Sequence, residues 1–186
     1  KVRKTRGFKG FLVNSYVPIE ASLCEEVFVI YPAEGTSVFI EDYEHFRIPD
    51  DVVVIGMENG ENFQRIRGQQ YLFDDLKVLF VSRYPQSTDL RTWSHMIPNR
   101  YFHFGDFYLA GIEIYPREFY VFLRERSEFF IPADVEERLK NGNRRLYDMQ
   151  YARYKFMDIM DERLLPLVEM IHRYGKGYEQ EGYIIG

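Results

Sequence analysis

Two acidic residues of this sequence stand where a metal-dependent reaction could be organised. Glu58 directly follows the apolar run 52–57, and Asp106 comes two residues after the aromatic run 101–104. Carboxylate oxygens are the preferred ligands of hard divalent ions such as Mg²⁺, and two carboxylates can hold such an ion beside a phosphate. Isolated acids after strands more often cap a helix or line a turn. Spacing alone leaves both interpretations open.

The runs that precede these acids have the pattern of buried parallel strands. Residues 51–56, 77–82 and 101–104 are predicted strands, and helical spacing predicts helices at 61–73, 87–97 and 109–119. An order of strand and helix repeated three times favours a parallel sheet with right-handed crossovers. Because ligands bind beyond the carboxyl ends of such strands, Glu58 and Asp106 would face one crevice if their strands are neighbours.

The remaining elements lie on both sides of this region. Residues 26–30 and 36–40 flank the turn-like sequence 32–35, which predicts an N-terminal hairpin. After a short strand at 128–131, helices are predicted near 132–140, 147–157 and 161–174, followed by a glycine-rich tail. We expect one compact unit, with a strand and hairpin extension over 1–50 and an α/β domain over 51–186. The chain begins with Lys1 rather than Met, as a piece of a longer protein would.

Three segments around the two acids carry a resemblance to a known family. They read Val-Val-Val-Ile-Gly-Met-Glu-Asn at 52–59, Phe-Val-Ser-Arg-Tyr-Pro at 80–85, and Tyr-Phe-His-Phe-Gly-Asp-Phe-Tyr-Leu-Ala-Gly-Ile at 101–112. These segments resemble the Toprim domain of topoisomerase VI A subunits and of the D subunits of Wadjet plasmid-defence systems. In that family a glutamate ends one strand, a Gly-Asp-x-Asp-x-x-Gly segment ends another, and a Glu-Gln-Glu segment lies near the C-terminus.

The resemblance implies a Toprim-like Rossmannoid fold and roles for individual residues. Glu58 matches the glutamate that serves as general acid or base at the scissile 3′ oxygen and contacts metal. Asp106 matches the first aspartate of the pair that holds Mg²⁺ or Mn²⁺. Tyr108 stands where the family has the second aspartate, and a phenol, whose ordinary pKa is about 10, is a poor Mg²⁺ ligand at neutral pH.

Other acidic residues could replace the missing aspartate. Glu179 and Glu181 form the Glu-Gln-Glu segment of the tail, and they would supply a carboxylate if the tail folds back onto the sheet edge. The alternative is a polar, frayed chain end. Glu113 is a weaker substitute, because two helical turns place it about 10 Å beyond Asp106.

Several basic residues are candidates for contacts with a DNA backbone. Five of the first nine residues are Lys or Arg, among them Lys4, Arg6 and Lys9, and Arg83 follows the second predicted strand. Against this, the formal net charge is −5, and short basic runs are usually solvated surface. An ordinary surface ion pair is the simpler role for Arg83.

Composition excludes several other classes of site. Because Cys24 is the only cysteine, we expect no intramolecular disulfide and no zinc site built on cysteine. The four histidines lack zinc-site spacing, and His103 is expected to be a packed strand residue. No phosphate-binding glycine motif is present, and no apolar run reaches the roughly 18 residues that span a bilayer. We therefore expect a protein of the reducing cytoplasm.

Three functional hypotheses follow from the sequence. The first is a Mg²⁺-dependent DNA-processing domain, a nuclease of Toprim type. The second is a catalytically degenerate Toprim-like module that binds DNA or assembles with other subunits or as a homodimer, which Tyr108 favours. The third is an unrelated α/β domain with a small-molecule pocket, in which Glu58 and Asp106 would not be coupled.

Overall fold

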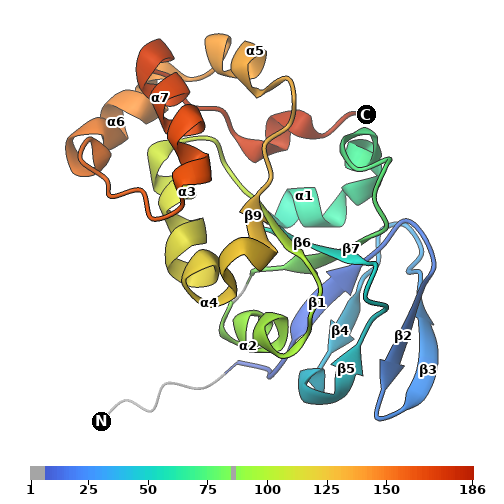
Figure 1. Ribbon diagram of the computed structural model, residues 1–186. Coiled ribbons are helices and arrows are strands. Elements are labelled where there is room, and N and C mark those ends of the chain that lie inside the picture. The colour runs from blue at the N-terminus through green and yellow to red at the C-terminus, as the bar shows by residue number, and fades with distance from the viewer. Residues whose placement is uncertain (1–6, 85–86) are drawn as a thin grey trace.

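A six-stranded sheet with the order β4-β1-β7-β6-β8-β9 forms the centre of the protein (Figure 1). The computed structural model describes residues 7–84 and 87–186. Strands β7, β6, β8 and β9 run parallel, and β1 and β4 extend the sheet in antiparallel pairings. The strands are β1 (Phe11–Asn14), β4 (Val38–Ile40), β6 (Val53–Met57), β7 (Val78–Ser82), β8 (Tyr101–Phe104) and β9 (Ser127–Phe129). The expected mixed α/β architecture with a mainly parallel sheet is confirmed.

The connections between the parallel strands place helices on both faces of the sheet. The chain leads from β6 to β7 through α1 (Gly60–Gln64) and a 3₁₀ segment (Ile66–Leu72). It then crosses back over β6 through α2 (Thr88–Met96) to reach β8. The connection after β6 runs toward β7, whereas the connection after β8 runs toward β9, in the opposite direction along the sheet. Right-handed crossovers that move in opposite directions lie on opposite faces, so the switch point of the sheet lies between β6 and β8. Such a switch point leaves a crevice at the carboxyl ends of the two strands.

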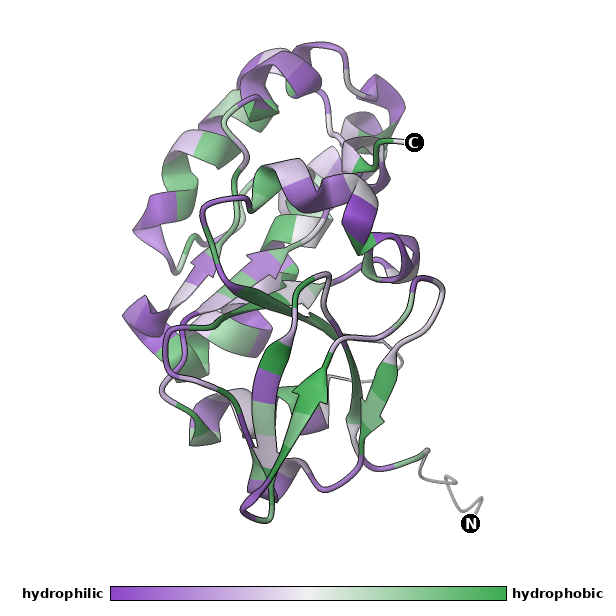
Figure 2. Cartoon of the chain, turned by 90° about the vertical axis from the view of Figure 1, so that its right-hand side faces the viewer, coloured by the Kyte–Doolittle hydropathy of each residue, from purple (hydrophilic) through white to green (hydrophobic). Residues whose placement is uncertain are grey.

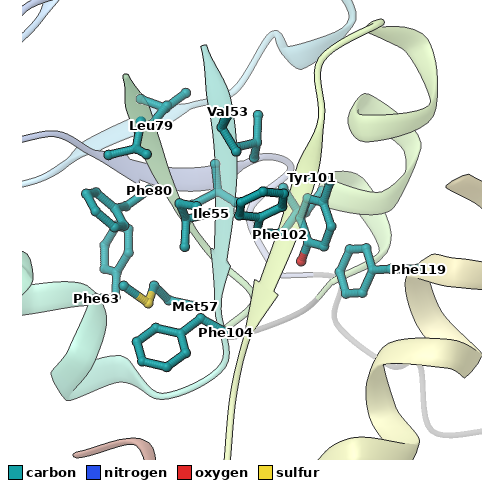
Figure 3. Close-up of a cluster of buried hydrophobic side chains, with 14 of the residues drawn as sticks. Val53, Ile55, Met57, Phe63, Leu79, Phe80, Tyr101, Phe102, Phe104 and Phe119 are labelled. Atoms are coloured by element: carbon teal, nitrogen blue, oxygen red, sulfur yellow. The ribbon is translucent and has the colours of Figure 1, made fainter. Parts of the chain in front are cut away.

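Aromatic side chains fill the core on both faces of this sheet. On one face Phe104 packs with Phe73 at a ring distance of 5.9 Å, near Met57 and Phe63 (Figure 3). On the other face Tyr101 stacks on Phe119 at 4.4 Å. Phe119 belongs to a π-helical turn (Pro116–Tyr120) that continues α3 (Leu109–Tyr115) into α4 (Val121–Leu123). The predicted helix 109–119 is therefore present, and Pro116 coincides with the change of helical type.

The N-terminal segments pair differently from the predicted hairpin. A second, antiparallel sheet has the order β3-β2-β5 and contains β2 (Ile19–Leu23), β3 (Glu26–Ile30) and β5 (Phe46–Arg47). Thus β3 pairs with β2, whereas β4 pairs with β1, and the expected pairing of 26–30 with 36–40 is wrong. The two-residue turn at Cys24 and Glu25 closes the real hairpin with φ values of 49° and 70°. This turn lacks the Asn-Gly or Asp-Gly signal by which such hairpins are recognised.

The C-terminal helices gather beside α3, at the opposite end of the molecule from the smaller sheet (Figure 1). They are α5 (Val135–Lys140), α6 (Arg144–Tyr154) and α7 (Leu165–Tyr174). Helix α6 begins three residues before the predicted start, because the Asn143 side chain accepts a hydrogen bond from the Leu146 amide. Hydropathy colouring shows mixed polar and apolar helices around the apolar central strands (Figure 2). None of the helices within the described residues has the length and apolar character needed to cross a bilayer.

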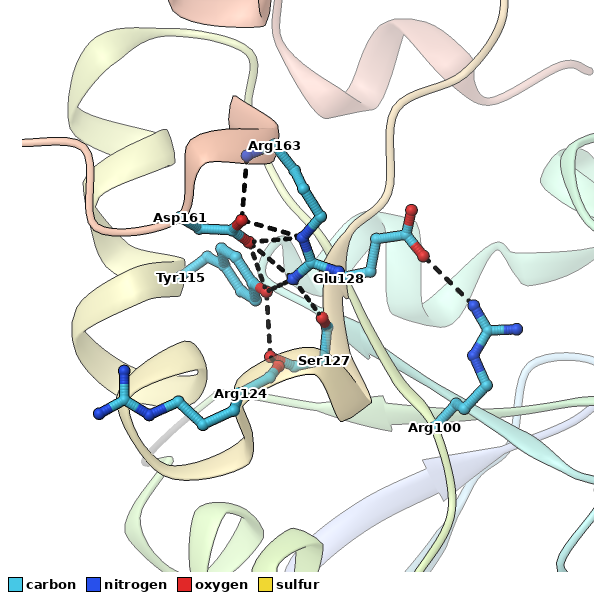
Figure 4. Close-up of polar contacts among 7 residues, drawn as sticks. All are labelled: Arg100, Tyr115, Arg124, Ser127, Glu128, Asp161 and Arg163. Carbon is cyan, nitrogen blue, oxygen red and sulfur yellow. Dashed lines mark hydrogen bonds and ion pairs between the residues drawn. The ribbon is translucent and has the colours of Figure 1, made fainter. Parts of the chain in front are cut away.

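An ion pair between the buried Asp161 and the exposed Arg163 fastens this helical group to the sheet. Asp161, which is 2% exposed, accepts a 2.7 Å hydrogen bond from Arg163 Nη2 and a 3.2 Å bond from the Tyr115 hydroxyl (Figure 4). Arg163 also donates to the backbone carbonyl of Ser127 in β9 at 2.6 Å. Burial alone would raise the pKa of Asp161, but the hydrogen bonds from Arg163 outweigh it and hold this pKa below its ordinary value.

Candidate acidic site at the strand ends

Glu58 and Asp106 lie at the carboxyl ends of two neighbouring parallel strands. Strands β6 and β8 are hydrogen-bonded partners, with Met57 opposite Phe104. The Glu58 amide continues this pairing by donating to the Phe104 carbonyl at 3.2 Å. The two acids therefore flank the switch point of the sheet, the place where ligands of open α/β sheets commonly bind. The condition that the sequence left open, that their strands be neighbours, is met.

A buried histidine holds the carboxylate of Glu58. His103 in β8 has no exposed surface, and its Nε2 lies 3.2 Å from Glu58 Oε2. An ionised carboxylate can only accept, so this contact is a hydrogen bond to ionised Glu58 in the tautomer that carries its proton on Nε2. Aromatic rings surround the imidazole, and its Nδ1 has no hydrogen-bond partner. His103 is thus packed, as expected, but it also orients Glu58, a role that the sequence did not predict.

Gly105 makes room for the carboxylate of Glu58. A Cβ atom at this position would lie 2.3 Å from Glu58 Oε2 and 3.0 Å from His103 Nε2, well inside van der Waals contact. A side chain at position 105 would therefore force the Glu58 carboxylate away from its place beside His103. The Gly-Asp sequence at 105–106 positions the first acid as well as carrying the second.

Both carboxylate oxygens of Asp106 accept strong hydrogen bonds. Oδ1 accepts from the Gln180 amide at 2.7 Å, and Oδ2 accepts from the Tyr108 hydroxyl at 2.6 Å. Burial raises the pKa of Asp106 above its ordinary value, and the nearby charges of Glu58 and Glu179 add to this rise, while the two hydrogen bonds oppose it. Burial also raises the pKa of Tyr108, and the bond to Asp106 adds to the effect, so the phenol keeps its proton.

The tail folds back onto the sheet edge through backbone and amide contacts. Phe107 and Tyr178 exchange two backbone hydrogen bonds of 2.8 and 3.0 Å. The Gln180 carbonyl accepts from the Asn62 side chain at 3.0 Å, and the Gln180 side chain accepts from the Asn59 amide at 3.3 Å. Gln180 is therefore the main link between the tail and the acidic edge. Glu179 and Glu181 were the expected functional residues of this segment, and nothing in the sequence pointed to Gln180 between them.

The proposed substitute carboxylates lie in different surroundings. Glu179 is exposed and close enough to raise the pKa of Asp106, and Glu181 accepts from the Asn59 side chain at 2.7 Å. Glu113 instead lines a cavity between α3 and the segment after α6. In the described part of the chain, no three of Glu58, Asp106, Glu179 and Glu181 have ligand oxygens all within 4.8 Å of one another. A shared ion would require these side chains to reorient.

Two of the basic residues predicted to contact DNA form ion pairs with glutamates, and the other two lie outside the described residues. Arg83 donates two 2.8 Å hydrogen bonds to Glu118, which lies in the π-helical turn after α3. Lys9 forms an ion pair of 2.6 Å with Glu44. Lys4 and Arg6 fall outside the described residues. A phosphate group would therefore have to displace Glu118 before it could bind the Arg83 guanidinium.

We expect Asp106→Asn to increase the free energy of unfolding at pH 7. The Asn oxygen can accept from the Gln180 amide, and its NH2 group can donate to the Tyr108 oxygen in place of the present bond, but the side chain carries no charge beside Glu58 and Glu179. Because the pKa of Asp106 is raised in the folded state, its ionised form costs stability at neutral pH. This cost, and the gain from Asn, should vanish as the pH falls through the raised pKa towards the ordinary value of 3.8.

Chemical denaturation from pH 3 to pH 8 would measure this effect, with the exposed Asp158→Asn as the matched control. The control should behave like the wild type at every pH. If Asp106→Asn were less stable than the wild type at pH 7, the ionised carboxylate would be a net stabiliser through its two donors.

No protein-family model matches the chain, and no curated protein is significantly similar to it. The segments around residues 58, 83, 106 and 180 lie at the carboxyl edge of one sheet or fold back onto it.

Proposed function

We propose that the chain is a Mg²⁺-dependent DNA-processing domain of Toprim type that hydrolyses phosphodiester bonds. The observation that carries this proposal is the pair of carboxylates at the switch point, whose mutual repulsion contributes to the raised pKa of Asp106. Within the described residues, neither Glu58, Asp106 nor Glu179 forms an ion pair with Lys or Arg. Carboxylates at neighbouring strand ends that form no ion pair with Lys or Arg are what a divalent cation would neutralise.

The donor set agrees with a hard ion. Every candidate ligand is an oxygen, and Mg²⁺ in phosphate-transfer sites needs only one or two protein carboxylates because water completes its coordination. Glu58 and Asp106 would hold the ion, and Glu179 is the nearest further carboxylate. Bound Mg²⁺ would neutralise charge on the phosphate and lower the pKa of a water molecule.

The residues of the chain would divide the remaining work. Glu58 would hold or deliver a proton at the 3′ oxygen, and His103 would fix the direction in which its carboxylate points. The guanidinium of Arg83 would position the DNA backbone after exchanging Glu118 for a phosphate, which is a comparable bidentate partner. Any contribution from Lys4, Arg6 or Lys9 would be to backbone affinity rather than to sequence recognition.

A second candidate function is favoured by Tyr108. Its hydroxyl occupies Asp106 Oδ2 at 2.6 Å, where the resembled family would have a second acid near the metal. A domain closed in this way would serve as a degenerate Toprim-like module for DNA binding or for assembly with other subunits or a second copy. In that case the acidic edge is a structural anchor for the tail.

Calorimetric titration of Mn²⁺ separates these two functions. We expect saturable binding to the wild type and at least about tenfold weaker binding to Glu58→Gln and to Asp106→Asn. Glu113→Gln, in the cavity beside α3, is the matched control and should bind like the wild type. Absence of binding by a folded wild type would overturn the nuclease proposal and leave the assembly module.

A further inference from the structure

Three side chains that commonly bind metals meet at one end of the smaller sheet, apart from the acidic edge. Cys24 Sγ lies 3.3 Å from Asp42 Oδ2, and His45 Nδ1 lies 2.9 Å from Asp42 Oδ1. The thiol, carboxylate and imidazole ligand atoms all lie within 4.8 Å of one another. Among the described residues, no other three Cys, His, Asp or Glu side chains meet this closely.

The folding of two local segments brings these ligands together. Cys24 begins the two-residue turn between β2 and β3, in a left-handed conformation. Strand β2 also pairs with β5, with Leu23 opposite Phe46, so the residue after Leu23 lies beside the residue before Phe46. That neighbour is His45, at the end of a 3₁₀ turn (Tyr43–His45) capped by Asp42. Residues three apart eclipse in a 3₁₀ turn, so Asp42 and His45 share one face.

We propose that Cys24, Asp42 and His45 bind one divalent transition ion of the Zn²⁺ class. A tetrahedral ion with bonds of about 2.0 to 2.3 Å separates its ligand atoms by about 3.3 to 3.7 Å. The observed separations of 3.3 Å and 2.9 Å are close to this range. One sulfur, one nitrogen and one oxygen ligand select a borderline ion over the hard Mg²⁺ or Ca²⁺.

The surroundings of these ligands agree with a cation site. Cys24 and His45 are exposed and Asp42 is half-buried, so an ion can reach all three, and water can take the fourth position. The Cys24 thiol donates to the Asp42 carboxylate at 3.3 Å, and the carboxylates of Glu25 and Glu26 follow it directly in the sequence. The same carboxylates favour a positive ion in place of the thiol proton. Such a site would use one cysteine, whereas the sequence led us to expect no zinc site built on cysteine.

Cobalt titration tests this proposal with little ambiguity. Because Cys24 is the only cysteine, a thiolate-to-Co²⁺ absorption band can arise only from this residue. We expect such a band to saturate at one Co²⁺ per chain and to be displaced by Zn²⁺. Cys24→Ser should remove the band, and His45→Ala and Asp42→Asn should each weaken binding at least about tenfold.

Two controls make the result decisive. His95→Ala, an exposed histidine on α2, should leave the titration unchanged, as should Glu58→Gln at the acidic edge. Circular dichroism of each variant would establish that it is folded. The proposal is overturned if the wild type gives no thiolate band, or if the band survives unchanged in both His45→Ala and Asp42→Asn.

Discussion

Replacing Gly56 with alanine should destabilise the protein by about 3 kcal/mol or more. The added Cβ would lie 1.8 Å from the Tyr101 hydroxyl oxygen and 2.4 Å from the ring carbon that carries it. Tyr101 cannot easily move away, because its ring is buried and stacks on Phe119 at 4.4 Å. Either the sheet must open between β6 and β8 or the aromatic stack must break. The midpoint of urea unfolding measures this loss.

Two control variants separate this clash from other effects of glycine replacement. Gly60→Ala should change stability by less than about 0.5 kcal/mol, because no atom lies within 4 Å of its added Cβ. Tyr101→Phe should also be mild, because the hydroxyl of Tyr101 has no hydrogen-bond partner in the structure. An unchanged unfolding midpoint for Gly56→Ala would mean that the aromatic layer on this face can shift.

Changing Tyr108 to aspartate should tighten Mn²⁺ binding at least about tenfold. The substitution removes the hydroxyl that occupies Asp106 Oδ2 and puts a carboxylate in its place. It also crowds one more negative charge against Glu58 and Glu179, so the metal-free variant should be less stable than the wild type. Added Mn²⁺ should therefore raise the melting temperature of the variant more than that of the wild type.

Tyr108→Phe is the matched variant, because it removes the same hydrogen bond without adding an acid. If it binds Mn²⁺ more tightly than the wild type, the hydroxyl itself blocks Asp106. If neither variant gains affinity, the position of Tyr108 is not part of a metal site. DNA cleavage that appears only in Tyr108→Asp would identify the natural chain as the degenerate module.

The parallel strands could be located from the sequence with good accuracy, and their order could not. Continuous apolar runs predicted β6, β7 and β8 within two residues, because strands buried on both faces need no polar alternation. Neighbour relations depend on contacts between distant residues, which periodicity does not encode. The sequence therefore could not establish that Glu58 and Asp106 follow neighbouring strands, and the pairing of β6 with β8 in the structure shows it.

Other parts of the site depend on packing that no local pattern shows. His103 reads as an ordinary strand residue, and its role follows from the close approach that Gly105 allows. Gly56 was expected at the end of a strand, but it lies inside β6. A glycine is needed there because the Tyr101 side chain fills the space that a Cβ atom would occupy. Strand β1 was missed because its four residues, Phe11–Asn14, are too short for a clear signal.

The attachment of the tail also affects how fast a ligand could reach the acidic edge. Its hydrogen bonds join residues 74, 118 and 121 positions apart, so they can close only after the sheet has formed. The segment is also held by the buried Tyr183 ring and by Arg138, which donates to the Gly182 carbonyl at 2.8 Å. Its release would have to break these contacts in one local unfolding step, which would expose Asp106 and Asn59 together. The rate and equilibrium of that opening, rather than diffusion, would then limit how quickly a ligand reaches the acidic edge.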